Sequence, residues 1–147
     1  MSAAAKRDIR LDDLPGHLFR RLHQLAVARF SAEMEEIGLT PIQWAAMMAT
    51  SQRPGLDQST LSREIHIDTS TIAGVLDRLE ARGLIQRKPS PDDRRLRLLD
   101  LTDEGEALLE QATVAVLDMQ EWLVEPLTAR ERAVLMKLML KVLHRLE

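Results

Sequence analysis

The spacing of apolar residues predicts a chain that is helical at both ends. Leucines recur at intervals of three and four, which predicts a long helix over about residues 13–36. Asp12 or Asp13 is expected to cap this helix, ahead of a proline in its first turn. The sequence Thr-Pro-Ile-Gln at 40–43 then starts a second helix, because it combines a capping Thr, a proline at the first position and the Gln of a capping box.

Two shorter helices follow, separated by a tight turn. Asp57 caps the first, which is predicted over 57–67, and Asp68 caps the second, which is predicted over Thr69–Arg82. Apolar residues recur at helical spacing along the second helix until Gly83 ends it. Two short helices at this spacing suggest a helix-turn-helix.

Beyond that glycine, the apolar pattern changes to partial alternation. Residues 84–88 and 96–101 are predicted strands, joined by a turn at 89–93, so that they form a β-hairpin with a basic tip. Thr102 opens another long helix, which a proline stops, and a capping box at 128–131 starts a final helix. Both of these helices are apolar on more than one side.

The long terminal helices predict a homodimer. The helix that follows the hairpin would span about 36 Å at 1.5 Å per residue. A chain of 147 residues cannot easily cover three such helices with one small core, whereas a partner subunit can. The expected fold is mainly α with a small β-hairpin wing: a winged helix-turn-helix with long N- and C-terminal dimerisation helices. The expected units are an N-terminal dimerisation helix at 1–38, a winged DNA-binding domain at 39–101 and C-terminal dimerisation helices at 102–147, which together form one obligate-dimer unit.

Composition narrows the classes of function. The absence of Cys excludes a disulfide framework, a thiolate zinc site and a cysteine nucleophile. The histidines form no metal pattern, and no Ser-His-acid constellation or phosphate loop points to an enzyme or a cofactor. No apolar run suits a membrane span and no secretion signal starts the chain, so a cytoplasmic protein without membrane contact is expected.

The distribution of charge favours nucleic acid. The chain has a net charge of −3, yet residues 84–97 carry five basic residues against two acidic ones. A local basic patch on an acidic body is a footprint for a phosphate backbone. With aromatic residues at 3% of the chain, a stacking platform for single strands is improbable, which leaves duplex DNA as the expected partner.

The order of helix-turn-helix, basic wing and long C-terminal helices resembles the MarR family of bacterial transcription regulators. Residues 39–44 look like the opening of the family's second helix, and 69–85 look like its recognition helix and first wing strand. Residues 93–102 fit the family's wing signature, with Leu99 where Val is commoner. The resemblance implies a sequence-specific, ligand-responsive repressor that binds a pseudo-palindromic operator as a homodimer.

On this reading, the recognition helix and the wing supply the DNA contacts. Hydroxyls at the helix N-terminus can reach base edges or phosphates, and an arginine on a thin hairpin can enter the minor groove. The candidate DNA-binding residues are Ser59, Thr60, Arg63, Thr69, Ser70, Thr71, Gly74, Arg78, Arg87, Lys88, Arg94 and Arg97. Arg94 is assigned to the minor groove, and Arg87, Lys88 and Arg97 are expected to contact phosphates. Arg95 matches the signature arginine and is expected to pair with Asp93 to hold the wing in shape. The three residues of the shorter helix could equally face solvent.

The resemblance also implies a small-ligand site in the cleft between the dimer helices and the winged domain. Candidate cations for a carboxylate are His17, Arg20, Arg21 and His23, and candidate apolar walls are Trp44, Met47 and Met48. The alternative is that the apolar residues belong to the core and the arginines pair with acids across the dimer. Residues 11–22 and 39–46 also look like the branch that controls catabolism of aromatic acids such as nicotinate, benzoate or hydroxycinnamates. An aromatic carboxylate or its thioester is therefore the expected effector.

Two other classes of function fit parts of the pattern. A non-specific architectural DNA-binding protein would bind random and operator DNA alike. A helical protein-interaction adaptor would not bind DNA, and the basic wing argues against that reading.

Overall fold

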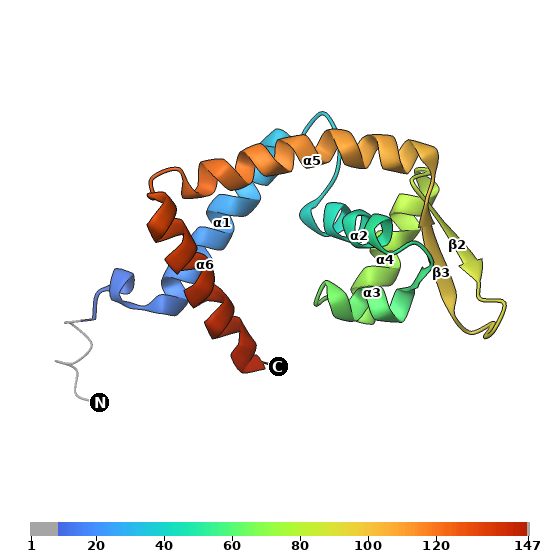
Figure 1. The fold of residues 1–147 in the computed structure, drawn as a ribbon, viewed down its shortest axis with the longest axis horizontal. Helices are drawn as coiled ribbons and strands as arrows, with labels where there is room; N and C mark the ends of the chain where they lie inside the picture. Colours follow the sequence, from blue (N-terminus) through green and yellow to red (C-terminus); the bar gives the residue numbers. More distant parts are fainter. Residues whose placement is uncertain (1–8, 147) are drawn as a thin grey trace.

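A computed structural model describes residues 9–146, while positions 1–8 and 147, which belong to the expected terminal segments, lie outside it. Six α-helices and a small sheet form an arch (Figure 1). The helices are α1 (Pro15–Glu33), α2 (Pro41–Gln52), α3 (Gln58–Glu64), α4 (Thr69–Ala81), α5 (Asp103–Val124) and α6 (Ala129–Leu143). The strands are β1 (Leu56–Asp57), β2 (Ile85–Pro89) and β3 (Arg97–Leu101), and short 3-10 turns cover Leu11–Asp13 and His144–Leu146.

In Figure 1, α5 crosses the top of the arch and joins its two ends. One end contains α1 and α6, and the other contains α2, α3, α4 and the sheet. The predicted fold class, mainly helical with a winged helix-turn-helix, is confirmed. Among the described residues, no helix is both long and apolar enough to cross a membrane.

Local sequence signals place most helix boundaries correctly. The capping box that starts α2 is present, because the Thr40 hydroxyl accepts from the Gln43 amide at 3.2 Å and the Gln43 side chain accepts from the Thr40 amide at 3.0 Å. The expected acidic cap of α1 is wrong: the cap position is Leu14, and both aspartates lie in the preceding 3-10 turn. Helix α3 ends earlier than expected, and His66 in the following turn has a φ of 55°.

The wing contains one more strand than the sequence suggests. The predicted hairpin is present as β2 and β3, which pair antiparallel with Ile85 opposite Leu101. A two-residue strand, β1, pairs with the other edge of β3, so the strand order is β1-β3-β2. A strand of two residues is too short to show alternation, which is why the sequence pattern does not reveal it.

The hydrophobic core lies at the winged end of the arch. Its fully covered side chains come from α2, α3, α4 and β3, and include Met47, Leu61, Ile72, Leu76, Leu79 and Leu99. One face of α5 continues this core through Leu109, Ala112, Val116 and Met119. The opposite end is different, because α6 has no buried residue and Phe30 is the buried residue of α1.

The wing is fixed to α5 at a close backbone contact. The Thr102 hydroxyl donates to the Gly83 carbonyl at 2.6 Å, and the Thr102 amide donates to the Leu84 carbonyl at 3.1 Å. Gly105 lies against the same Leu84 carbonyl, and a Cβ at this glycine would overlap the carbonyl oxygen. The first turn of α5 can therefore approach the wing only because position 105 has no side chain.

We expect Gly105→Ala to lower the free energy of unfolding by about 1–3 kcal/mol, the usual cost of overpacking a tight site. Urea unfolding at a fixed protein concentration measures this effect. Gly74→Ala is the matched control, because a Cβ at Gly74 would meet nothing within 4 Å. That variant is expected to gain about 0.5–1 kcal/mol from helix propensity. Equal stability of Gly105→Ala and the wild type would contradict the close contact.

Candidate DNA interface and ligand cavity

Helix α4 presents a polar face to solvent and an apolar face to the core. Ile72, Leu76 and Leu79 are buried, whereas Thr69, Ser70, Thr71 and Arg78 are exposed. Of the predicted contacts, this helix also carries Gly74, where open space leaves room for a close approach. The helix predicted to read DNA therefore has a free surface with hydroxyl and guanidinium groups.

Asp68 organises the start of α4. Its carboxylate accepts from the Thr71 amide at 2.8 Å and from the hydroxyls of Ser70 and Thr71, each at 2.6 Å. These hydrogen bonds, led by those from the two hydroxyls, hold the pKa of Asp68 well below its usual range, so that the cap stays ionised at neutral pH. The hydroxyls of Ser70 and Thr71 thus have their protons directed toward the cap.

Helix α3 offers fewer free groups than the sequence predicts. The Thr60 hydroxyl donates to Asp57 at 2.5 Å and accepts from the Arg63 guanidinium at 3.1 Å. The hydrogen bond from that hydroxyl is also the main reason why the pKa of Asp57 is lowered. The residues Ser59 and Arg63 are both exposed to solvent. The Thr60 hydroxyl is therefore occupied by the capping residue Asp57 in this structure, while the other two residues remain available.

The wing loop is held by hydrogen bonds between its own side chains and its backbone amides. Ser90 is buried at the base of the loop, where its hydroxyl accepts from the amides of Asp92 and Asp93 at 3.3 and 3.4 Å. The Arg95 amide donates to the Asp93 carboxylate at 3.0 Å, but the Arg95 Nε lies 4.0 Å from it and the side chain is 94% exposed. The expected pair of Asp93 and Arg95 is therefore present, with the guanidinium at the outer limit of an ion pair and a shorter hydrogen bond from the Arg95 amide. Arg94 is exposed in the same loop.

The basic residues on the two strands of the wing differ in exposure and in partners. Lys88 and Arg97 are exposed. Arg87 is 22% exposed and lies between two carboxylates of α4, at 2.6 Å from both Asp77 and Glu80. Burial lowers the pKa of Arg87, but the hydrogen bonds and charges of the two acids outweigh it and raise the pKa above its usual range. This engagement with α4 differs from the free phosphate contact that the sequence suggested.

An apolar cavity of about 250 Å³ lies where α1, α2 and α5 meet. His23, Val27 and Phe30 line it from α1, Trp44 lines it from α2, and Met119 and Gln120 line it from α5. The Trp44 indole N–H donates to the Thr113 hydroxyl at 3.4 Å, which fixes the ring against α5. A mainly apolar space of this size with one imidazole at its wall suits a small aromatic ring that carries a polar group.

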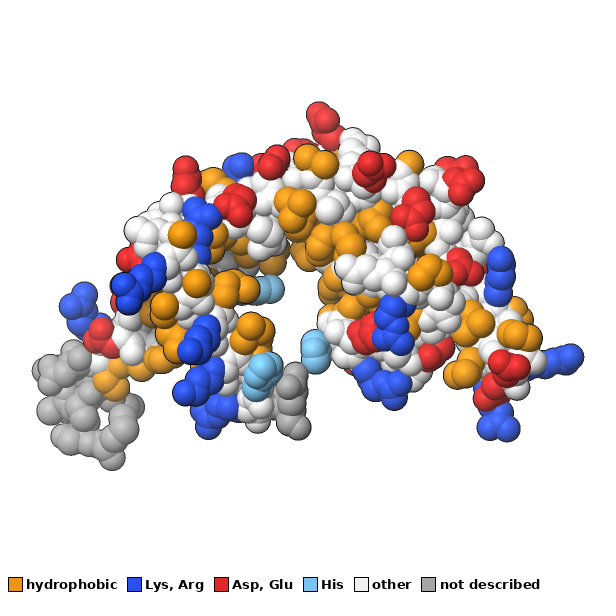
Figure 2. Space-filling view, viewed as in Figure 1, with side chains coloured by type: hydrophobic (Ala, Val, Ile, Leu, Met, Phe, Trp, Pro, Cys, Tyr) orange, Lys and Arg blue, Asp and Glu red, His pale blue; other side chains and the backbone are white. Residues whose placement is uncertain are grey.

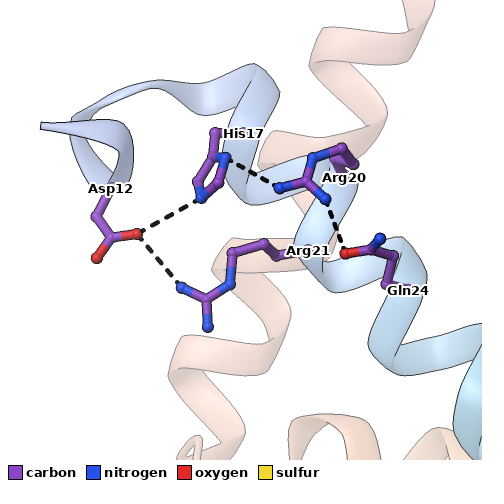
Figure 3. Close-up of polar contacts among 5 residues, drawn as sticks. All are labelled: Asp12, His17, Arg20, Arg21 and Gln24. Atoms are coloured by element: carbon purple, nitrogen blue, oxygen red, sulfur yellow. Dashed lines mark hydrogen bonds and ion pairs between the residues drawn. The ribbon is translucent and has the colours of Figure 1, made fainter.

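The structure brings together two of the seven predicted ligand residues in this cavity, His23 and Trp44. Met47 belongs to the core, and Met48 lines a different hollow between α2 and α5. The remaining three, His17, Arg20 and Arg21, lie on α1 and form a polar cluster with Gln24 and with Asp12 of the preceding 3-10 turn (Figure 3). No group of three or more His, Asp or Glu residues within 9–146 could hold a metal ion.

Within that cluster the two arginines differ in their partners. Arg21 pairs with the Asp12 carboxylate at 3.3 Å. Arg20 contacts the Gln24 side-chain oxygen at 2.9 Å and the His17 Nδ1 at 3.2 Å, and the His17 Nε2 in turn lies 3.9 Å from Asp12. The charge of Arg20 is therefore not matched by an adjacent carboxylate in these contacts, whereas that of Arg21 is.

Comparison with known proteins assigns the fold to a family. A family model described as "MarR family" matches residues 37–96. The HTH-type transcriptional repressor NicR of Pseudomonas putida is 33% identical over 128 residues, which cover 87% of this chain and 81% of NicR. The crystal structure of the PcaV regulator from Streptomyces coelicolor with its natural ligand is 37% identical, with a TM-score of 0.88 over 100% of both chains. The chain belongs to the MarR family.

Members of the MarR family are DNA-binding transcription regulators rather than enzymes, and they bind DNA as dimers. The expectation of a DNA-binding regulator that is not an enzyme is confirmed. A further MarR-family structure describes regulation of DNA binding of Bordetella bronchiseptica BpsR by 6-hydroxynicotinic acid. It has 29% identity to this chain and a TM-score of 0.86, and it covers 91% of this chain and 96% of BpsR.

Several cavity and wing residues of this MarR-family chain escape sequence reasoning. Val27 and Phe30 lie four and seven positions after His23, so their shared helix face was visible in the sequence. Met119 and Gln120 come from α5, and only the packing of α5 on α1 brings them to the cavity. Ser90 gave no signal, because its role depends on the shape of the wing loop.

Arg94→Ala is expected to weaken operator binding by about 1–3 kcal/mol and to leave the fold unchanged, since the side chain is exposed at the wing tip. Fluorescence anisotropy at several salt concentrations measures the loss. Arg95→Ala is the comparison within the same loop, where the side chain is also exposed, and it should cost less. Unchanged affinity of Arg94→Ala would remove this residue from the DNA interface.

Proposed function

We propose that this protein is a ligand-responsive repressor that binds a pseudo-palindromic operator as a homodimer. Each subunit places α4 in a major groove and its wing beside the flanking minor groove. The observation that carries this proposal is the shared end of the arch: the free polar face of α4 and the exposed arginines of the wing extend from one small domain. Because it acts on chromosomal DNA, its place is the cytoplasm.

The second subunit would cover the apolar end of the arch. Figure 2 shows hydrophobic side chains at the surface of this end, beside Lys and Arg. Exposed fractions reach 53% at Leu22 on α1 and 58% at Leu143 on α6. A helix in a protein gains most of its stability from packing of its apolar face, so the exposed apolar residues of this end indicate a surface that a partner covers. We therefore assign residues 1–38 and 102–147 to dimerisation and residues 39–101 to DNA binding.

Leu138→Gln tests this arrangement, because Leu138 is 53% exposed in the single chain. We expect this variant to lower the dimer fraction in sedimentation equilibrium. We also expect it to lower the free energy of unfolding by more than about 0.5 kcal/mol, the usual limit for surface substitutions. Lys137→Gln changes the adjacent exposed residue and is expected to do neither. A wild-type protein that is monomeric at micromolar concentration would refute the proposed dimer.

The effector of this repressor would be an aromatic carboxylate in the cavity between α1, α2 and α5. Phe30 and Trp44 supply aromatic walls, and His23 supplies a polar group at the edge. Arg20 lies one helical turn before His23 and contacts an amide oxygen and an imidazole rather than a carboxylate, so its charge is available to a carboxylate. The regulation of DNA binding of BpsR by 6-hydroxynicotinic acid supports this class of effector, and the complex of PcaV with its natural ligand supports a small-molecule effector in general.

One contact connects the cavity side of the molecule to the recognition helix. The Arg82 guanidinium, at the end of α4, donates to the Gly38 carbonyl at 2.6 Å and to the Ile37 carbonyl at 3.3 Å. Both carbonyls lie in the loop between α1 and α2, which are two walls of the cavity. A ligand that shifts α1 against α2 would therefore move α4 and favour a spacing of the two recognition helices that does not fit the operator.

Titration of the protein–operator complex with 6-hydroxynicotinic, benzoic and 4-hydroxycinnamic acids, and with their coenzyme A thioesters, tests the response. The duplex is selected by the protein from a random pool. At least one compound is expected to weaken binding, with a coupling of about 1–3 kcal/mol. If none of the compounds weakens binding, the ligand-responsive mechanism is wrong. In a separate comparison without ligand, equal affinity for random and selected DNA would favour an architectural role.

Arg20→Gln and Arg21→Gln then form a matched pair. Arg20→Gln is expected to raise the concentration of the active acid needed for release by about tenfold, or about 1.4 kcal/mol, whereas Arg21→Gln leaves it unchanged. Operator affinity without the acid should be the same for both variants. Equal sensitivity of the two variants would show that Arg20 does not select the carboxylate.

A further inference from the structure

Arg87 joins the wing to the recognition helix. It occupies the middle of β2, opposite Leu99 on β3. Its Nε donates to a Glu80 carboxylate oxygen at 2.7 Å, and its Nη2 donates to Asp77 at 2.6 Å. Asp77 and Glu80 are three residues apart and therefore share a face of α4. One planar guanidinium thus spans two carboxylates on the neighbouring element.

The position of Arg87 along the strand gives this contact its significance. Ile85, at the start of β2, is buried in the core, whereas Lys88 and Pro89 beyond Arg87 are exposed. Arg87 is therefore the outermost side chain of β2 that is packed against the rest of the domain. From this point the hairpin extends to the loop that carries Arg94. On its other edge the hairpin is paired with β1 as far as Leu98. Arg87 is therefore the outermost attachment on the side that faces α4, and the angle between the wing tip and α4 depends on it.

The local charge argues against a direct phosphate contact. Two carboxylates surround one guanidinium, so the group of three has a net charge of −1. A phosphate would be repelled by this group, and reaching it would require the guanidinium to leave charge-assisted hydrogen bonds at 2.6–2.7 Å. The pKa of Arg87, raised by the same acids, is consistent with a cation held in place.

We propose that Arg87 is a positioning residue for operator recognition, which sets the angle of the wing against α4 through Asp77 and Glu80. This inference rests on the proposed binding of α4 and the wing to one operator half-site. It replaces the phosphate contact expected from the sequence. Lys88 and Arg97, which are exposed on the same hairpin, keep their role as phosphate contacts.

The decisive experiment neutralises the two acids while Arg87 remains. In the combined variant Asp77→Asn, Glu80→Gln, two negative charges near the DNA are removed. If Arg87 contacts phosphate, its release and the lost repulsion should strengthen operator binding. If Arg87 positions the wing, binding should weaken by about tenfold, a change of about 1.4 kcal/mol, despite the favourable change in charge. Anisotropy titrations with the selected operator duplex separate these opposite results.

Salt dependence provides an independent measurement on Arg87 itself. A lost phosphate contact reduces the magnitude of the negative slope of log affinity against log salt by about 0.9. Lys88→Met is expected to show that decrease, whereas Arg87→Met should lose affinity with the slope unchanged. Arg87→Lys should recover part of the affinity, because an ammonium can still pair with one acid. Combining Arg87→Met with the acid variant should add no further loss, since both remove the same link.

A shortened operator separates positioning from general damage to the fold. The wild type is expected to lose affinity when the base pairs beneath the wings are removed, whereas Arg87→Met should lose much less. A variant that is merely unstable would be weakened on both duplexes in proportion, and its unfolding curve would show this. A decrease in salt slope with Arg87→Met, or tighter binding by the acid variant, would overturn the proposal. Failure of the wild type to bind any duplex would refute the proposed function instead.

Discussion

Burial of one face of α5 is the constraint on which the rest of the arch depends. The side chains of Leu109, Ala112, Val116 and Met119 close the core of the winged end and continue toward α1. The first turn of the same helix is fixed to the start of the wing by Gly105 and Thr102. The guanidinium of Arg29 on α1 stacks over the Trp122 ring, 4.9 Å from its centroid, near the other end. One rigid helix thus sets the distance between the two ends of the subunit.

This arrangement explains why the cavity lies where it does. The core side chains fill the space beneath α5 at the winged end. The loop that joins α1 to α2 ends at Thr40, and α1, α2 and α5 do not fill the space between them. The resulting space is bounded by helices from both ends of the arch. A molecule that fills it would contact α1, α2 and α5 together, which is the requirement for coupling the two ends of the arch through a single helix framework.

Sequence reasoning succeeds where the signal is local. The capping side chains of Thr40, Asp57, Asp68, Thr102 and Thr128 are all confirmed, because a cap involves residues within three positions of each other. It fails at Asp12 and Asp13, where capping residues form a separate 3-10 turn, and at β1, which is defined only by its partner β3. The candidate site divides in the same way. His23 and Trp44 reach the cavity, whereas Met47 and Met48 lie on other faces of the same helix.

The amino-acid sequence by itself determined the order of elements, the apolar and polar faces of the helices, and the family of transcription regulators. These depend on the period of the backbone and on short motifs, which tertiary contacts leave intact. Only the tertiary structure decided which charges are free. It directed Arg87 to two acids on α4, left the Arg95 side chain largely in solvent, and gave Arg20 an amide oxygen and an imidazole as partners while Arg21 received a carboxylate. The physical reason is that the partner of a long charged side chain is chosen by which elements pack beside it, and packing joins residues that are far apart in the sequence.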